Sequence, residues 1–226
     1  MLLPVLFFTL LVASASFADF QKGFDAAERG DYTTALNEWL PLAEQGQPDV
    51  LFNLGLLYMK GAGVPQNYGT AVKWFELAAE QGHPDAGLNL GQIYRQGLGV
   101  IQDHSVATKW FSFGAKHGDM AAQYNLGVSY DQGLGVPQNY RAALKWFKLA
   151  AEQGHPDAQY NLGLKYALGQ GIKQDNVYAY MWWRIAFLQG DKVVQKNLGI
   201  IEKKMSSAQL ETAEKLAHEW VEKHQK

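Results

Sequence analysis

Residues 139–169 read NYRAALKWFKLAAEQGHPDAQYNLGLKYALG and contain two helical patterns joined by a turn. In the first half, Ala143, Phe147 and Ala150 recur at spacings of four and three, which places them on one face of a helix. Gly154 follows the last of these positions and marks the end of that helix. The stretch therefore predicts one helix, a turn, and the start of another helix.

The second half has the same character. Ala158, Leu162 and Tyr166 are four residues apart and form an apolar face. Gly163 lies beside Leu162 inside this helix, where glycine is about 1 kcal/mol less favourable than alanine. A glycine kept at such a place predicts close approach of the paired helix. The Gly-x-Gly that begins at Gly169 fits a left-handed helix end and a tight turn.

These features return every 36 residues, and a fixed period of about 20–50 residues is typical of solenoids and propellers. Each unit predicts two helices, the second opened by an Asp or Asn that caps free backbone N–H groups. The recurring positions are Asn-Leu-Gly at 53–55, 89–91, 125–127, 161–163 and 197–199, the caps Asp31, Asn67, Asp103, Asn139 and Asp175, and Trp74, Trp110, Trp146 and Trp182.

The two ends depart from the pattern, as expected of terminal repeats that must cover an exposed core. The first unit is short and lacks the Asn-Leu-Gly signature. In the last unit, Ser206 and Gln209 have capping-box spacing before a closing helix that runs to about His224. The apolar face predicted for that helix consists of Leu210, Ala213, Ala217, Trp220 and Val221.

We therefore predict an all-α fold, a single α-solenoid of helix-turn-helix repeats over residues 19–226. The predicted units are 19–46 (partial), 47–82, 83–118, 119–154, 155–190 and a capping unit, 191–226.

The first 18 residues predict a secretory signal peptide. An uncharged apolar run, MLLPVLFFTLLVA, is too short to span a bilayer comfortably, and small residues follow it up to Ala18. Cleavage before Asp19 would leave a periplasmic or secreted chain of a Gram-negative bacterium with no stable membrane span. The alternatives are an uncleaved anchor and a buried hydrophobic strand.

Composition excludes several kinds of site. The 226 residues include no cysteine, which rules out disulfides, a cysteine-ligated zinc, a thiol nucleophile and a lipid anchor on cysteine. A net charge of −2 argues against nucleic acid as a partner. The 23 glycines fall mainly in the repeated helices and turns, and Gly-x-Gly follows a helix here, whereas a dinucleotide-binding loop follows a strand.

The repeat resembles a known family. The pattern A-x3-LG-x2-Y-x2-G-x-GV, followed by D/N-x3-A-x2-WF-x2-A-x-QG, is similar to the Sel-one-like repeat, a relative of the tetratricopeptide repeat. The ending AYMWWRIAFLQGD, residues 179–191, is also similar to that family's endings. One unit carries the pattern at Ala86, Leu90, Gly91, Tyr94, Gly97, Gly99, Val100, Asp103, Ala107, Trp110, Phe111 and Gly118.

The resemblance implies a right-handed superhelix of helix pairs and a role as a scaffold that binds proteins or peptides. It also implies a concave groove lined by the first helix of each pair. The groove positions that it implies are Phe52, Asn53, Leu56 and Met59; Leu88, Asn89, Gln92 and Arg95; Tyr124, Asn125, Val128 and Asp131; and Tyr160, Asn161 and Leu164.

Two repeated residue types leave alternatives open. The asparagines either bind the backbone of an extended peptide or form hydrogen bonds between helices inside the array. The aromatic groove residues would anchor partner side chains, since interface hot spots favour aromatics. The repeated tryptophans either pack between units or stack on carbohydrate.

No set of residues indicates catalysis. The six histidines include no pair at helical spacing, so we expect no metal site, no cofactor and no catalytic residue. The sequence thus predicts a non-enzymatic periplasmic or secreted adaptor. The alternatives are an envelope enzyme or a protein that binds β-lactams or peptidoglycan, and a carbohydrate-binding module.

Overall fold

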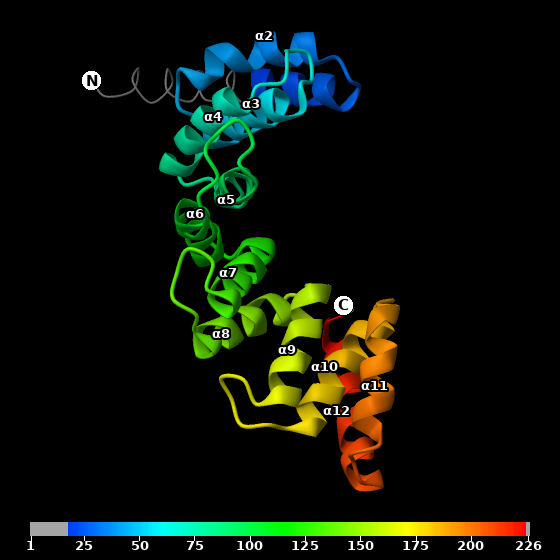
Figure 1. The fold of residues 1–226 in the computed structure, drawn as a ribbon. Helices are drawn as coiled ribbons and strands as arrows, with labels where there is room; N and C mark the ends of the chain where they lie inside the picture. The colour runs from blue at the N-terminus through cyan, green and yellow to red at the C-terminus, as the bar shows by residue number, and fades with distance from the viewer. Residues whose placement is uncertain (1–17, 225–226) are drawn as a thin grey trace, which may run out of the picture. The chain divides into compact units, whose positions relative to one another are not determined.

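The computed structural model describes residues 18–224, and no strand occurs in this range (Figure 1). The predicted all-α class is confirmed. The predicted signal peptide lies outside the described residues except for Ala18. Within the described range, no helix has both the length and the apolar character needed to cross a membrane.

The described part of the chain divides into two compact units, residues 18–103 and 104–224. The first contains a helix over residues 18–28, α2 (Tyr32–Ala43), α3 (Pro48–Lys60), α4 (Tyr68–Glu80) and α5 (Ala86–Gln96). The second contains α6 (His104–Lys116), α7 (Met120–Gln132), α8 (Tyr140–Glu152), α9 (Pro156–Leu168), α10 (Asn176–Leu188), a short 3₁₀ turn η1 (Lys192–Val194), α11 (Gln195–Glu202) and α12 (Ser207–His224).

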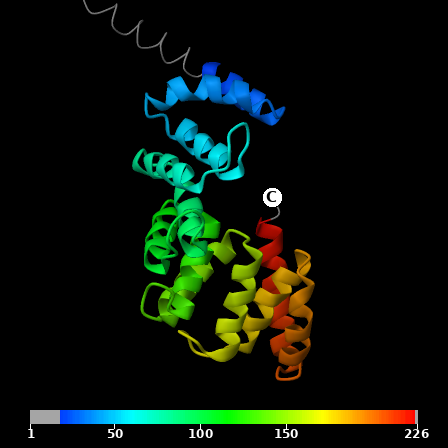
Figure 2. The same ribbon diagram turned by 45° about the horizontal axis from the view of Figure 1, so that its top comes forward.

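Within each unit, consecutive helices from α2 to α5 and from α6 to α10 lie side by side as the repeat predicts (Figures 1 and 2). The helix α8 shows how the sequence produces this arrangement. The Asn139 side chain caps its first turn by accepting from Ala142 N, at 3.0 Å. Its apolar face then buries Phe147 completely, and burial of one such ring contributes about 1.5–3 kcal/mol.

The glycine of the Asn-Leu-Gly signature is where an aromatic ring of the second helix reaches the first. A Cβ atom added at Gly127 would lie 2.6 Å from Phe147 Cδ1, closer than real side chains approach. The same distance separates an added Cβ at Gly163 from Trp183 Nε1, whose N–H donates to Tyr160 O at 3.0 Å. The predicted close approach of the paired helix is confirmed at these positions.

The shortened first pair uses a glycine that the sequence pattern missed. Gly23 lies directly under the Trp39 ring, and Trp39 Nε1 donates to Phe20 O at 3.2 Å. This pair has no Gly-x-Gly loop, so its glycine stands 16 residues before the ring and not 20 as at Gly163. The contact therefore has the same geometry as the one at Gly163, although the number of residues between glycine and ring differs.

The Gly-x-Gly turns have the predicted left-handed helix ends. Gly169 ends α9 with φ +68°, and the second glycine of this turn, Gly171, has φ +78°. A side chain at Gly171 would collide with the backbone at Tyr140, where α8 begins. The turn thus also spaces one pair from the next.

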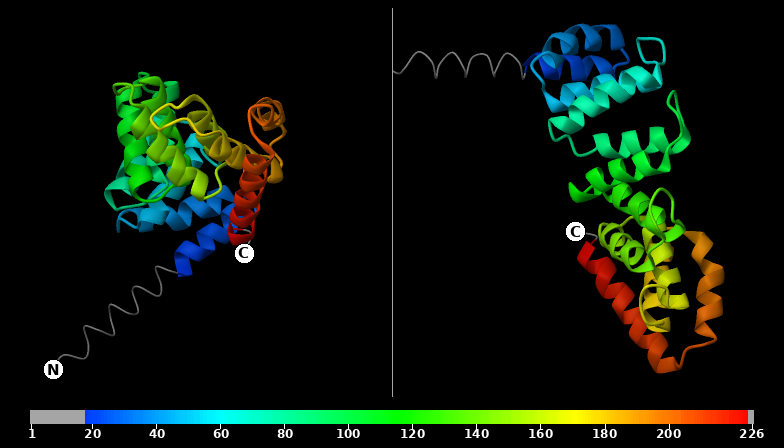
Figure 3. Two further views of the ribbon diagram at one scale, coloured as in Figure 1. Left: turned by 90° about the horizontal axis from the view of Figure 1, so that it is seen from below. Right: turned by 60° about the vertical axis from the view of Figure 1, so that its left-hand side comes forward.

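The last pair is assembled differently. The helices α11 and α12 pack against α10 from different sides (Figure 3, right), and the predicted capping box opens α12, with Ser206 N donating to Gln209 Oε1. Met181 of α10 is buried in the cluster that Ala217 of α12 joins, whereas the equivalent residue of α8, Lys145, is exposed. Because α12 covers that outer face, α10 is apolar nearly all round.

Candidate functional site

Two predicted groove residues of the first unit line a cavity. Asn53 and Leu56 of α3 border a hollow of about 220 Å³, opposite Phe24 and Glu28 of the helix over residues 18–28. The remaining lining residues are Ala27, Tyr32, Trp39, Leu57, Lys60 and Ala62. The walls are mainly apolar, and they carry one amide, one carboxylate and one ammonium group.

The aromatic groove residues Phe52 and Tyr124 are partly committed to packing. The Phe52 ring stacks on the imidazole of His83 with centroids 4.1 Å apart, and the Tyr124 ring stacks on that of His155 at 4.5 Å. These two contacts are 72 residues apart, or two repeats. Both rings are half-buried, and their role as anchors for a partner stays a prediction.

Of the histidines in these stacks, His83 is buried and His155 is half-buried. Burial lowers the pKa of His83 below its ordinary value, although Asp85 and Asp49 oppose the effect. Its Nδ1 accepts from Asp85 N at 3.3 Å, which leaves Nε2 facing Asp49 Oδ1 at 3.5 Å. Burial likewise lowers the pKa of His155, against the opposing influence of Asp157 and Asp119.

Two of the repeated asparagines bond within their own helices. Asn89 Nδ2 donates to Asp85 O at 3.1 Å, and Asn125 Nδ2 donates to Ala121 O at 2.8 Å. In both contacts the acceptor is a carbonyl four residues earlier in the chain, and the two alternatives drawn from the sequence stay predictions. A side chain four residues beyond a carbonyl reaches it readily on a helix.

Asp131 is engaged by a residue that the sequence analysis missed. Lys165 of α9, only 2% exposed, donates to Asp131 Oδ1 and to Gln170 Oε1, the latter at 2.8 Å. Its ammonium also lies 4.9 Å from the centre of the Tyr140 ring. The sequence already marks this lysine as unusual, because the 36-residue register places it where Leu57 stands in an earlier repeat.

The other groove candidates are half-buried on the first helices. Val128 packs against the core that Phe147 and Leu162 share. Tyr160 and Leu164 pack against the cluster formed by α10 and α11. The half-buried remainder consists of Met59, Leu88, Gln92, Arg95 and Asn161.

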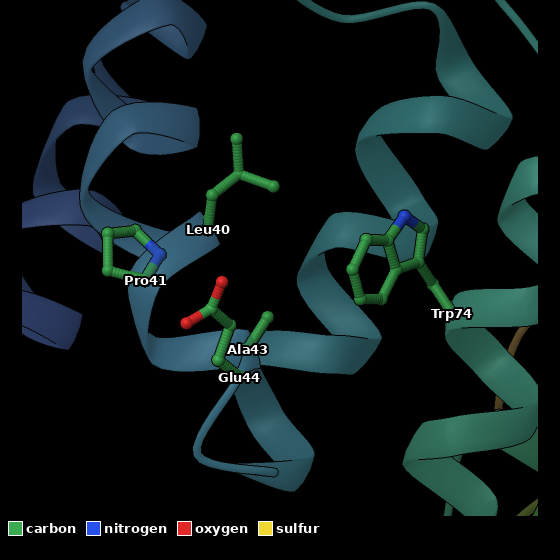
Figure 4. A pocket seen from close by; sticks show the side chains of 5 residues that line it. All are labelled: Leu40, Pro41, Ala43, Glu44 and Trp74. Atoms are coloured by element: carbon green, nitrogen blue, oxygen red, sulfur yellow. The ribbon is translucent and has the colours of Figure 1, made fainter.

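The tryptophans are divided between two environments. Trp182 is buried and meets Trp220 of α12 edge-on, with centroids 6.0 Å apart. Trp74 is half-buried and faces an open hollow of about 500 Å³, across from the C-terminal end of α2 (Figure 4). The predicted packing role therefore fits Trp182, while one face of Trp74 stays accessible.

A polar cluster joins α10 to α12. Glu214 accepts from Tyr180 Oη at 2.6 Å and from Arg184 Nε at 3.0 Å. Burial, and then the hydrogen bond to Glu214, raises the pKa of the Tyr180 phenol. Between residues 18 and 224, no three His, Cys, Asp or Glu side chains gather closely enough to hold a metal ion.

The Sel1 repeat model matches four consecutive segments, residues 48–83, 84–119, 121–155 and 156–191, which together cover more than half of the chain. The chain belongs to the Sel1 repeat family. Such repeats generally form non-enzymatic scaffolds that mediate protein interactions.

Solved structures include two similar proteins. One is c5321, a protective antigen present in uropathogenic Escherichia coli strains that displays an SLR fold, with 38% identity over 92% of this chain and a TM-score of 0.81. The other is a Sel1 repeat protein from Oxalobacter formigenes, with 38% identity over 74% of this chain and a TM-score of 0.68. A search of curated proteins found no match.

This Sel1 repeat chain spans about half the length of those two proteins, 46% and 49% respectively. The likeness therefore establishes the family and the fold of the shared part. The partners of the longer proteins are not carried over.

Proposed function

We propose that the chain is a periplasmic or secreted adaptor, without catalytic activity, that binds a peptide segment of a partner protein on its first helices. The observation that supports the proposal is the cavity lined by Asn53 and Leu56, two of the residues that the resemblance implies for the groove.

The chemistry of that cavity suits an extended peptide. Phe24, 39% exposed, and Leu56 provide apolar contact for one side chain. The Asn53 amide can both donate to and accept from a peptide backbone. Glu28 and Lys60 place opposite charges on the walls, which favours a polar segment around one apolar anchor.

A photo-crosslinking amino acid at Leu56, in cells of the source organism, tests the site. We expect a discrete crosslinked protein that disappears when Phe24→Ala is added, because the anchor pocket is then lost. The matched control carries the crosslinker at Lys73, an exposed position on α4. Equal products from both positions, or none from Leu56, would contradict the proposal.

A separate experiment tests the periplasmic or secreted location. N-terminal sequencing of the protein recovered from the periplasm or the medium is expected to begin at Asp19. A protein that retains Met1 in the cytoplasm would contradict the location and leave the binding site to its separate test.

A further inference from the structure

A second cleft, in the other compact unit, lies between α10 and α11. Its volume is about 350 Å³, within the usual range for ligand sites. The lining residues are Tyr180, Arg184, Phe187, Gln195, Leu198, Gly199 and Glu202. Gly199 belongs to the fifth copy of the Asn-Leu-Gly signature.

In three earlier copies, at Gly55, Gly127 and Gly163, this glycine faces an aromatic ring, but Gly199 faces open space. A Cβ atom added there would meet nothing within 4 Å. In the α7–α8 and α9–α10 pairs, the ring that covers the glycine stands 20 residues after it, at Phe147 and Trp183. The residue 20 positions after Gly199 is Glu219, which has no ring. Moreover, α12 packs against α10 and not along α11. No residue between 18 and 224 therefore occupies this ring position.

The complete pairs show what such a position accepts. At both Gly23 and Gly163, a tryptophan lies on the glycine and its indole N–H donates to the carbonyl three residues earlier. The corresponding carbonyl for Gly199 belongs to Lys196. In the α9–α10 pair, the ring is carried by a helix that lies along the first helix.

Apolar side chains line the cleft, and others are exposed elsewhere on the two helices that form it. Ile200 is 49% exposed and Leu188 is 38% exposed, on the two helices that form the cleft. Phe187 and Leu198 add apolar surface inside it. This surface is suited to one face of an amphipathic helix.

The charged residues near the cleft favour one kind of partner helix. Residues 191–204 carry four lysines, all exposed, and two acidic residues. Inside the cleft, the charge of Arg184 is paired with Glu214, and Glu202 is the remaining acidic group. Residues 191–204 therefore have a net charge of +2, which favours an acidic helix along α11, with the Glu202 carboxylate of the lining as the opposing charge.

We propose that the cleft between α10 and α11 docks an acidic amphipathic helix of a partner protein, which places a tryptophan ring on Gly199. This site is separate from the cavity at Leu56 and does not depend on it.

A peptide from the chain itself provides the probe. Residues 31–46, DYTTALNEWLPLAEQG, carry Trp39, which docks on Gly23 in its own unit, and three acidic side chains without a basic one. A labelled, end-capped form is titrated with the full chain and followed by fluorescence anisotropy. Saturable binding is expected, and a Trp39→Ala peptide is expected to bind at least about tenfold more weakly, as for loss of an aromatic hot spot.

The variant Gly199→Ala is the decisive test. Its methyl group meets nothing in the free protein, so the fold is retained, but it would lie where the docked ring must approach. We expect at least about tenfold weaker binding with an unchanged or higher melting temperature. Gly69→Ala, at a glycine of α4 whose added Cβ would lie 3.4 Å from its nearest neighbour, Asn67 Oδ1, is the matched control and should bind as the unaltered chain does.

Four outcomes would overturn the proposal. The first is no saturable binding up to about 1 mM peptide. The second is equal binding by Gly199→Ala and the unaltered chain. The third is self-association of the chain that Gly199→Ala abolishes in sedimentation experiments, which would make a second copy the occupant. Loss of binding with Leu56→Ala alone would assign the peptide to the other cavity and also count against the proposal.

Discussion

The pairs α7–α8 and α11–α12 carry the same Asn-Leu-Gly signature in their first helices, but the two glycines have different surroundings. Gly127 lies under the fully buried Phe147 ring, whereas Gly199 opens onto a cleft. The following helix makes the difference, because α8 packs along α7 while α12 packs against α10. A repeated glycine thus marks a place that accepts a ring, and the ring itself must come from a neighbour.

The ion pairs also differ between the interior and the end of the array. The largest loss of stability is expected when the buried interior pair is broken. Asp131→Ala leaves the ammonium of Lys165, whose side chain is 3% exposed, without its carboxylate. Loss of one partner of a buried pair destabilises by about 3–5 kcal/mol. Urea denaturation measures this loss, and the double variant Asp131→Ala/Lys165→Met should recover much of it.

The terminal pair is the control for that prediction. Arg184 and Glu214 have side chains 26% and 32% exposed, so Glu214→Gln is expected to cost about 1 kcal/mol or less. If the losses at Asp131 and Glu214 are equal, burial does not distinguish the two pairs.

The glycines themselves provide the second prediction. Gly127→Leu forces the Phe147 ring out of its place and should destabilise by about 1–3 kcal/mol through overpacking. Gly199→Leu, at the same position of the repeat, should change stability little. Thermal melting of the two variants compares them directly, and an unchanged melting curve for Gly127→Leu would remove the packing explanation.

The turns before the first helices also differ between the interior and the end of the array. The histidines of the interior turns predict that folding stability depends on pH. His155 precedes α9, whereas the equivalent Asp191 precedes η1 and caps it through Val193 N. Because burial holds the pKa of His83 and His155 below the ordinary 6.5, folding favours the neutral rings. This contribution is complete above pH 6.5 and is lost as the pH falls below it.

The measurement is urea denaturation between pH 7.5 and 5. The variants His83→Gln and His155→Gln should each flatten the decline in stability below pH 6.5. A stability that rises as the pH falls, or an identical slope in the double variant, would contradict the burial of neutral histidine.

The smallest effect is expected at Gly199→Ala. Alanine is about 1 kcal/mol more favourable than glycine inside a helix, and the added methyl group meets no neighbour. Stability should therefore rise by up to about 1 kcal/mol. Gly127→Ala should instead lose stability, since its Cβ would lie 2.6 Å from the Phe147 ring. The opposite signs of two identical substitutions, read by calorimetry, are the sharpest test of the comparison.

Much of the fold could be predicted because the same capping and helix-ending residues recur in several repeats. Caps such as Asn139 and helix-ending glycines such as Gly169 depend on residues close in sequence. Gly23 was missed because a shorter turn shifts it out of register. Lys165 was missed because its meaning depends on Asp131, which lies 34 residues earlier. Of the candidate site, Asn53 and Leu56 line a cavity, while Phe52 and Asp131 contact residues of the chain itself.

The sequence by itself determined the all-α class, the 36-residue period, most of the helix ends and the family, because these follow from spacing, capping and turn chemistry within a few residues. Only the tertiary structure decided which glycines are covered, which ion pair is buried and where α12 docks. Those features depend on contacts between distant segments, and identical signatures such as those at Gly127 and Gly199 do not encode what lies across from them.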